Sequence, residues 1–145
     1  MPKNSATWRQ KRDPLFRGDG DPVASVDPKA HPSIVRHVLY LGGPGRSTPY
    51  HSTSEEREVA AMFAKRGRVW RTAVSRAKAQ QVEHISRLDL LGLLKGKGHG
   101  AAKWKSAFEV LQARRYVERW SEHLLSYRKL DDEARASEAA RQIFE

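Results

Sequence analysis

Three short segments of this chain carry residue types that can act together on a charged ligand. Phe16 and Arg17 place a permanent cation after an aromatic ring, and Glu109 supplies a carboxylate far downstream. Between them, residues 50–54 read Tyr-His-Ser-Thr-Ser, so a run of three hydroxyl residues lies close behind an aromatic. A guanidinium can donate two parallel hydrogen bonds to a phosphate group, and a carboxylate stabilises a developing positive charge. A hydroxyl triplet can end a strand, cap the next helix and leave one oxygen for a ligand.

The elements that position the triplet are predicted from the residues around it. Residues 50–53 have a strand pattern, and Ser54 is predicted to be the N-cap of the helix that follows. Val59, Met62 and Phe63 recur at helical spacing, so they are predicted to form the buried face of that helix.

The remaining elements follow from hydrophobic periodicity and from the positions of Gly and Pro. Strands are predicted at 14–17, 69–74 and 82–85, and the segment 34–41 is either a short strand or a helical turn. A loop is predicted at 42–49 and a short leucine-rich helix at 88–94. From residue 107 the pattern becomes helical, with one face made of Val110, Ala113, Val117, Trp120 and Leu124. A second amphipathic helix is predicted at 131–144.

Together these motifs resemble the mono-ADP-ribosyltransferase superfamily, in its Arg–Ser–Glu branch of bacterial toxins and effectors. That branch has an aromatic followed by Arg on its first strand, an aromatic-led Ser-Thr-Ser ending a central strand, and a later Glu. Phe16-Arg17 is similar to the first motif and residues 50–54 to the second. Residues 60–64, Ala-Ala-Met-Phe-Ala, are similar to the helix that follows in the family. The resemblance covers residues 13–120, approximately.

The family's third motif is similar to residues 107–111, so Glu109 is predicted to be the catalytic glutamate, with Glu118 and Glu122 as reserves. The family often has Glu or Gln two positions before this glutamate, whereas position 107 is Ala. The resemblance implies that the missing residue orients an arginine acceptor. The alanine at position 107 therefore argues against arginine as the acceptor and is compatible with other acceptors, including nucleic acid.

The resemblance also implies that NAD is the substrate and that ADP-ribose moves to a nucleic acid or protein acceptor. Cleavage of the bond between nicotinamide and ribose gives the ribose oxocarbenium character, as in glycoside hydrolysis. Glu109 would stabilise that charge, while Arg17 would bind the pyrophosphate. The residues predicted to bind NAD are Arg17, Gly18, Tyr50, Ser52, Thr53, Ser54 and Phe63. No metal site is predicted, because the six histidines lack metal-ligand spacing.

The charge and composition limit the partners. A formal net charge of +10 favours polyanions, including nucleic acid or an acidic immunity or antitoxin protein. The absence of cysteine excludes disulfides, thiolate metal sites and cysteine nucleophiles. No apolar run approaches the roughly 18 residues that span a bilayer, and no signal peptide is evident. We therefore expect no membrane partner and a cytoplasmic location in the producing or a target cell, reached without a classical signal peptide.

Two other functions compete with the enzyme. The first is a basic nucleic-acid-binding or nuclease module, in which tryptophans stack on bases and Lys or Arg contact phosphates. Its four tryptophans would be Trp8, Trp70, Trp104 and Trp120. The second is a non-catalytic module whose C-terminal helices dock a partner. The enzyme requires Arg17, Ser52 and one glutamate to converge, whereas the other two functions do not.

The predicted fold is α+β, with a small split β-sheet like that of ADP-ribosyltransferases, flanking helices and a helical C-terminus. Residues 1–12 are predicted to be a flexible basic arm, residues 13–128 the catalytic domain, and residues 129–145 a C-terminal helix.

Overall fold

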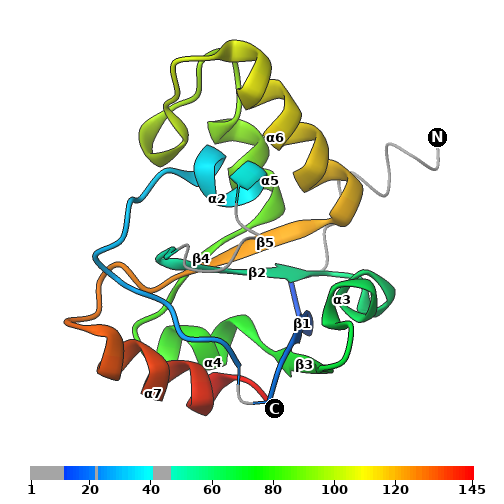
Figure 1. Ribbon diagram of the computed structural model, residues 1–145, viewed down its shortest axis with the longest axis vertical. Helices are drawn as coiled ribbons and strands as arrows, with labels where there is room; N and C mark the ends of the chain where they lie inside the picture. Colours follow the sequence, from blue (N-terminus) through cyan, green and yellow to red (C-terminus); the bar gives the residue numbers. More distant parts are fainter. Residues whose placement is uncertain (1–11, 22, 41–46) are drawn as a thin grey trace.

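The computed structural model describes residues 12–21, 23–40 and 47–145. These residues form an α+β fold with one five-stranded antiparallel sheet and six α-helices (Figure 1). The strands are β1 (Leu15–Asp19), β2 (Tyr50–Ser54), β3 (Arg68–Thr72), β4 (Glu83–Ile85) and β5 (Glu122–Ser126). The helices are α2 (Ile34–Tyr40), α3 (Arg57–Ala64), α4 (Val74–Ala79), α5 (Arg87–Leu93), α6 (Ala107–Trp120) and α7 (Glu133–Ile143), with a 3₁₀ turn at Gly100–Ala102.

The sheet has the strand order β3-β1-β2-β5-β4 and is nearly divided at its centre. Five residue pairs join β1 to β3, and five join β2 to β5. Strands β1 and β2, by contrast, are joined through the single pair Phe16 and Ser54. Figure 1 shows β1 running steeply away from β2 at this point. The backbone of β2 is thus unpaired along most of its β1 side, which leaves room for side chains from β1.

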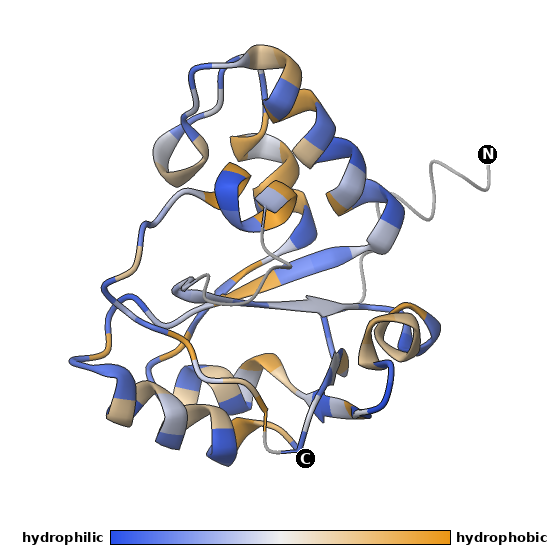
Figure 2. Cartoon of the chain, in the orientation of Figure 1, coloured by the Kyte–Doolittle hydropathy of each residue, from blue (hydrophilic) through white to orange (hydrophobic). Residues whose placement is uncertain are grey.

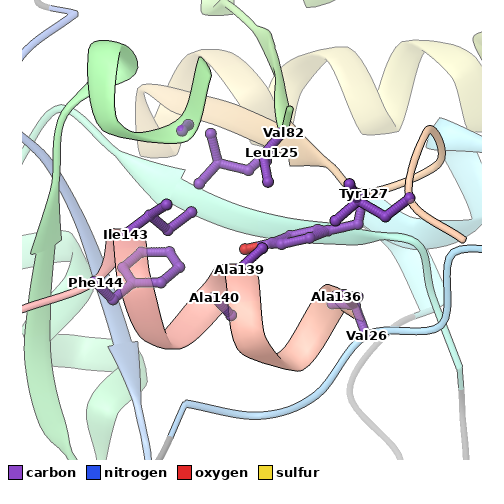
Figure 3. Packing of buried hydrophobic residues seen from close by; sticks show 11 residues of the cluster. Val26, Val82, Leu125, Tyr127, Ala136, Ala139, Ala140, Ile143 and Phe144 are labelled. Carbon is purple, nitrogen blue, oxygen red and sulfur yellow. The ribbon is translucent and has the colours of Figure 1, made fainter. Parts of the chain in front are cut away.

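Each face of the sheet is covered by its own hydrophobic core, because successive residues of a strand point to opposite faces. On one face, Tyr50 and Leu124 pack with residues of α2, α5 and α6. On the other face, Leu125 and Tyr127 pack against α7 through its buried residues Ala136, Ala139, Ala140 and Ile143 (Figure 3). Figure 2 shows that α6 and α7 each carry both hydrophobic and hydrophilic bands.

Helix α3 packs against β1 through its small residues, which corrects the predicted buried face. Met62 and Phe63 are exposed, whereas Ala60 is buried. A Cβ atom added at Gly18 would lie 2.0 Å from the Ala60 carbonyl oxygen and 2.5 Å from the Ala64 nitrogen. The helix backbone therefore reaches the β1 backbone directly. The larger side chains of α3 point away from the core as a result.

Most of the predicted elements are confirmed. The structure has strands at 15–19, 50–54, 68–72 and 83–85, and helices at 87–93, 107–120 and 133–143. The ambiguous segment 34–41 contains helix α2, and Leu124 lies in β5 rather than on the face of α6. The predicted arm, apart from residue 12, and most of the predicted loop at 42–49 lie outside the described residues. Helix α7, predicted as a separate terminal segment, shares a core with the sheet.

In the part of the chain that the structure describes, no helix has the length and apolar character needed to span a membrane.

Candidate active site

The site is centred on a hydrogen bond between two neighbouring strands. Ser54 of β2 lies opposite Glu122 of β5, and Ser52 lies opposite Leu124. Ser52 and Glu122 are therefore diagonal neighbours on the same face of the sheet, within reach of each other. The Ser52 hydroxyl donates to Glu122 Oε2 at 2.7 Å. This contact fixes a carboxylate beside the hydroxyl triplet.

Arg17 comes to the same place from β1. Its Nη1 donates to the Ser52 carbonyl oxygen at 2.9 Å, and its Nε donates to Asp19 Oδ2 at 2.8 Å. Asp19 is itself held by the backbone N–H groups of Gly20 and Ala24, at 2.6 and 3.1 Å. The Arg17 side chain is 17% exposed, and no described residue accepts from its Nη2. A fixed, partly accessible guanidinium thus lies at the point where the sheet divides.

His37 of α2 adds a residue that the sequence did not single out. Its Nε2 lies 2.7 Å from Ser52 Oγ, and its Nδ1 lies 2.7 Å from Thr48 Oγ1. Burial and the charge of Arg17 lower the pKa of His37 to about 3, so the ring is neutral. Because the one O–H of Ser52 donates its hydrogen bond to Glu122, Ser52 must accept from the Nε2–H of His37. The Nδ1 of His37 then accepts from the Thr48 hydroxyl. The hydrogen bonds therefore all point in one direction, from Thr48 through His37 and Ser52 to Glu122.

Glu122 has the properties of a functional carboxylate. Burial raises the pKa of Glu122 to about 7, and the Ser52 hydrogen bond and the Arg17 charge act against that rise. No described residue bonds to its second oxygen, Oε1. Glu122 as a whole is 7% exposed. One oxygen is held by the protein while the other can contact a ligand.

Glu109, the predicted catalytic residue, lies elsewhere. It is in the first turn of α6, and its backbone N–H donates to the Ser106 hydroxyl at 3.2 Å, so the helical pattern predicted from residue 107 is confirmed there. Its carboxylate accepts from Tyr40 and from Trp104 Nε1, and these hydrogen bonds lower the pKa of Glu109. Neither Arg17 nor Ser52 bonds to it. Glu109 instead links α2, the loop before α6 and the start of α6.

The other predicted NAD-binding residues are divided between the site and the core. Gly18 lies beside the site on β1, in contact with the backbone of α3. Tyr50 is 1% exposed, and its hydroxyl donates to the Pro32 carbonyl. Thr53 is on the opposite face and donates to the His123 carbonyl. These contacts give Tyr50 and Thr53 packing roles.

Two structural predictions for Ser54 and Phe63 are wrong: Ser54 is not the N-cap of α3, and Phe63 is not on its buried face. Ser54 ends β2 and donates to the Trp120 carbonyl at 2.7 Å. The N-cap of α3 is Glu56, so the prediction that Ser54 caps the helix is wrong, although its hydroxyl does accept from the Glu56 N–H. Phe63 is 54% exposed and meets the ring of Trp120 edge-on.

The arrangement can bind a phosphate at Arg17 and stabilise a positive charge at Glu122, with Ser52 setting the orientation of the carboxylate. The described residues include no group of three or more side chains suited to hold a metal ion. No protein-family model, no curated protein and no solved structure matches this chain. The functional assignment therefore depends on the motifs and on the geometry of the site.

Proposed function

We propose that this protein is an NAD-dependent ADP-ribosyltransferase of the toxin or effector type, which transfers ADP-ribose to a macromolecular acceptor. The observation that carries the proposal is the convergence of Arg17, Ser52 and Glu122 from three strands. The motifs containing Arg17 and Ser52 supported the resemblance in the sequence, and Glu122 was one of its reserve glutamates. Glu122 takes the catalytic role that the sequence predicted for Glu109.

Each of the three residues has a distinct role in the proposed reaction. The open N–H groups of Arg17 bind the NAD pyrophosphate. Ionised Glu122 stabilises the positive charge that develops on the ribose as its bond to nicotinamide breaks, and Oε1 accepts from a ribose hydroxyl. Ser52 keeps Oε2 in place. Nicotinamide leaves with the electrons of the broken bond, and the acceptor forms the new bond to the ribose while losing a proton.

The net charge of +10 supports a polyanionic or acidic partner for the same protein. We propose that the acceptor is encountered in the cytosol of the producing or a target cell. We also propose that an acidic immunity protein is the inhibitory partner.

The proposal is tested with NAD carrying separate labels on nicotinamide and adenine. Purified protein should release nicotinamide, and with cell extract it should transfer the adenine label to macromolecules. Nuclease and protease digestion of the product identifies the class of acceptor. If the wild-type protein releases no nicotinamide with or without extract, the proposed function is wrong, and salt-dependent nucleic-acid binding alone would favour the binding module.

Replacing His37 should impair the reaction through Ser52. In His37→Leu, the Ser52 hydroxyl loses its donor and can turn away from Glu122. One lost hydrogen bond of about 1.4 kcal/mol lowers kcat about tenfold, with KM for NAD nearly unchanged. The pH at which activity is half-maximal should also rise, because the Ser52 hydrogen bond lowers the pKa of Glu122.

The His37 prediction has two controls. His37→Gln keeps a side-chain N–H near Ser52 and should recover part of kcat, and the exposed His99→Leu should match wild type. The measurement is kcat and KM for nicotinamide release across pH 5.5–9, together with the unfolding midpoint of each variant. A wild-type kcat and pH midpoint in His37→Leu would show that His37 serves packing alone.

A further inference from the structure

An aromatic and cationic surface lies next to Glu122 and has no role in the steps above. Its members are Phe63 of α3, and Trp120 and Arg119 at the end of α6. The rings of Phe63 and Trp120 meet edge-to-face, with centroids 5.4 Å apart. The guanidinium carbon of Arg119 lies 4.7 Å from the centre of the Trp120 ring. We refer to these three residues as the aromatic platform.

The platform is attached directly to the candidate active site. Trp120 precedes Glu122 by two residues, and its carbonyl oxygen accepts from Ser54, the residue opposite Glu122 in the sheet. Figure 1 shows α3 beside the end of β2 and close to the C-terminal end of α6. A ligand bound to the platform therefore contacts residues that are close neighbours of Glu122, both in the sequence and across the sheet.

Core packing does not account for the exposure of the platform. Phe63 is 54% exposed and its neighbour Met62 is 61% exposed, because α3 uses Ala60 for its contact with β1. Arg119 is exposed, and no described carboxylate pairs with it. One turn earlier, Arg115 is exposed on the same side of α6. The surface thus combines the exposed ring of Phe63 and the half-buried ring of Trp120 with positive charge that no described carboxylate pairs.

We propose that the platform binds the acceptor, and that the acceptor is a single-stranded nucleic acid. This inference depends on the proposed function, because it concerns the second substrate of the same site. Unstacked bases bind aromatic rings and arginine planes, while the phosphates bind the arginine charges. In a duplex the base faces are covered by stacking, so the platform selects single strands. The chain's +10 charge is complementary to such a strand.

The binding test uses fluorescein-labelled 12-nucleotide single strands of RNA and DNA, with fluorescence anisotropy as the readout. Phe63→Ala should weaken binding about 5- to 100-fold, the range for loss of one base-stacking contact. Arg119→Ala should weaken binding and lower the salt dependence by about one phosphate contact. The matched controls are Phe108→Ala, an exposed ring at the other end of α6, and Arg141→Ala, an exposed cation on α7. Both controls should bind as the wild type does.

Several outcomes would overturn the proposal. Equal losses in Phe63→Ala and Phe108→Ala, or in Arg119→Ala and Arg141→Ala, would leave only general electrostatics. If the wild type does not bind single strands at low salt, or if it binds a duplex equally tightly, the proposal is wrong.

Acceptor-free NAD cleavage separates the platform from the catalytic site. Arg119→Ala, at an exposed residue with no predicted role in NAD binding, should leave this cleavage unchanged. A raised KM for NAD in Phe63→Ala would assign the ring to nicotinamide rather than to the acceptor. If wild type binds single strands through the platform but cleaves no NAD, the proposed function fails on its own. If it cleaves NAD but the platform variants bind normally, only the acceptor proposal fails.

Discussion

Glu122→Gln should reduce nicotinamide release by about 100- to 1000-fold, the usual effect of removing one preorganised charge from a transition state. Glutamine keeps the shape of the side chain and can still accept from Ser52. It lacks the negative charge that opposes the oxocarbenium ion. The measurement is NAD cleavage under saturating NAD, with and without acceptor.

Two other glutamates provide the matched controls. Glu109→Gln removes the carboxylate that accepts from Tyr40 and Trp104, and Glu118→Gln removes an exposed carboxylate paired with Arg114. Both variants should keep most of the wild-type rate. If Glu109→Gln is inactive while Glu122→Gln is active, the sequence prediction is right and the assignment of Glu122 is wrong.

The pH dependence gives a second test of Glu122. Because its pKa is raised to about 7, the ionised form becomes dominant only above neutral pH. The wild-type rate should therefore rise through about pH 7 and level off above it. The residual rate of Glu122→Gln should lack this step, since the glutamine does not titrate.

As the pH rises, the contribution of Glu122 to the stability of the folded protein should fall, whereas the rate should rise. A carboxyl group whose pKa rises from 4.5 to about 7 binds protons more tightly in the folded state. Its contribution to the free energy of unfolding therefore falls as pH rises from 4.5 to about 7, by on the order of 3 kcal/mol. At pH 8 we expect Glu122→Gln to be at least as stable as wild type. Loss of activity with retained stability would identify Glu122 as a residue kept for function.

All strands except β5, and most of the helices, could be predicted because their patterns are local. Residues 50–54 form a strand and α7 is amphipathic, as expected from β propensity and helical periodicity. Arg17 and Ser52 were singled out because their motifs resemble those of the family, and both lie on strands as predicted. Their convergence required the sheet register, which no local pattern contains.

The position of Glu122 at the start of β5 could not be predicted, because the end of α6 has no glycine signal. Ser121 adopts the left-handed conformation, with φ of 48°, where glycine is the common residue. The helical pattern was therefore extended to Leu124, and Glu122 was hidden inside it. A usable signal existed for Glu109, since Ser106 and Glu109 have the spacing of a helix capping box. The exposed face of α3 was missed because its contact with β1 is made by small residues.

We also expect the protein to lose stability in mild acid, because three histidines are held neutral. The pKa of His37 is lowered to about 3 by burial and by Arg17, and that of His84 to about 4 by burial and by His123. Burial lowers the pKa of His51 well below its usual value, with Arg17 acting in the same direction. Each ring is held by hydrogen bonds. His37 bonds to Ser52, His51 to Ala24 and Tyr127, and His84 to His123.

The sign follows from proton binding. Below about pH 6.5 these histidines take up protons in the unfolded chain but not in the folded protein. The free energy of unfolding therefore decreases as the pH decreases. The loss approaches about 1.4 kcal/mol per pH unit for each histidine until its folded pKa is reached. By pH 4 the three together should remove several kcal/mol, a large part of the 5–15 kcal/mol typical of a whole domain. Urea unfolding at pH 7, 6, 5 and 4, followed by circular dichroism, measures this loss.

Glu122 opposes this trend and makes the test more specific. Between pH 7 and 4.5 it gains protons mainly in the folded state, which stabilises the protein as pH falls, but it is one group against three. The balance places maximum stability near neutral pH. Glu122→Gln should steepen the acid loss, because the opposing group is gone, whereas His37→Gln should make it shallower by about one proton. The exposed His99→Gln should leave the slope unchanged. An unfolding free energy that stays constant or rises between pH 7 and 4 would mean that these histidines do not remain neutral in the folded protein.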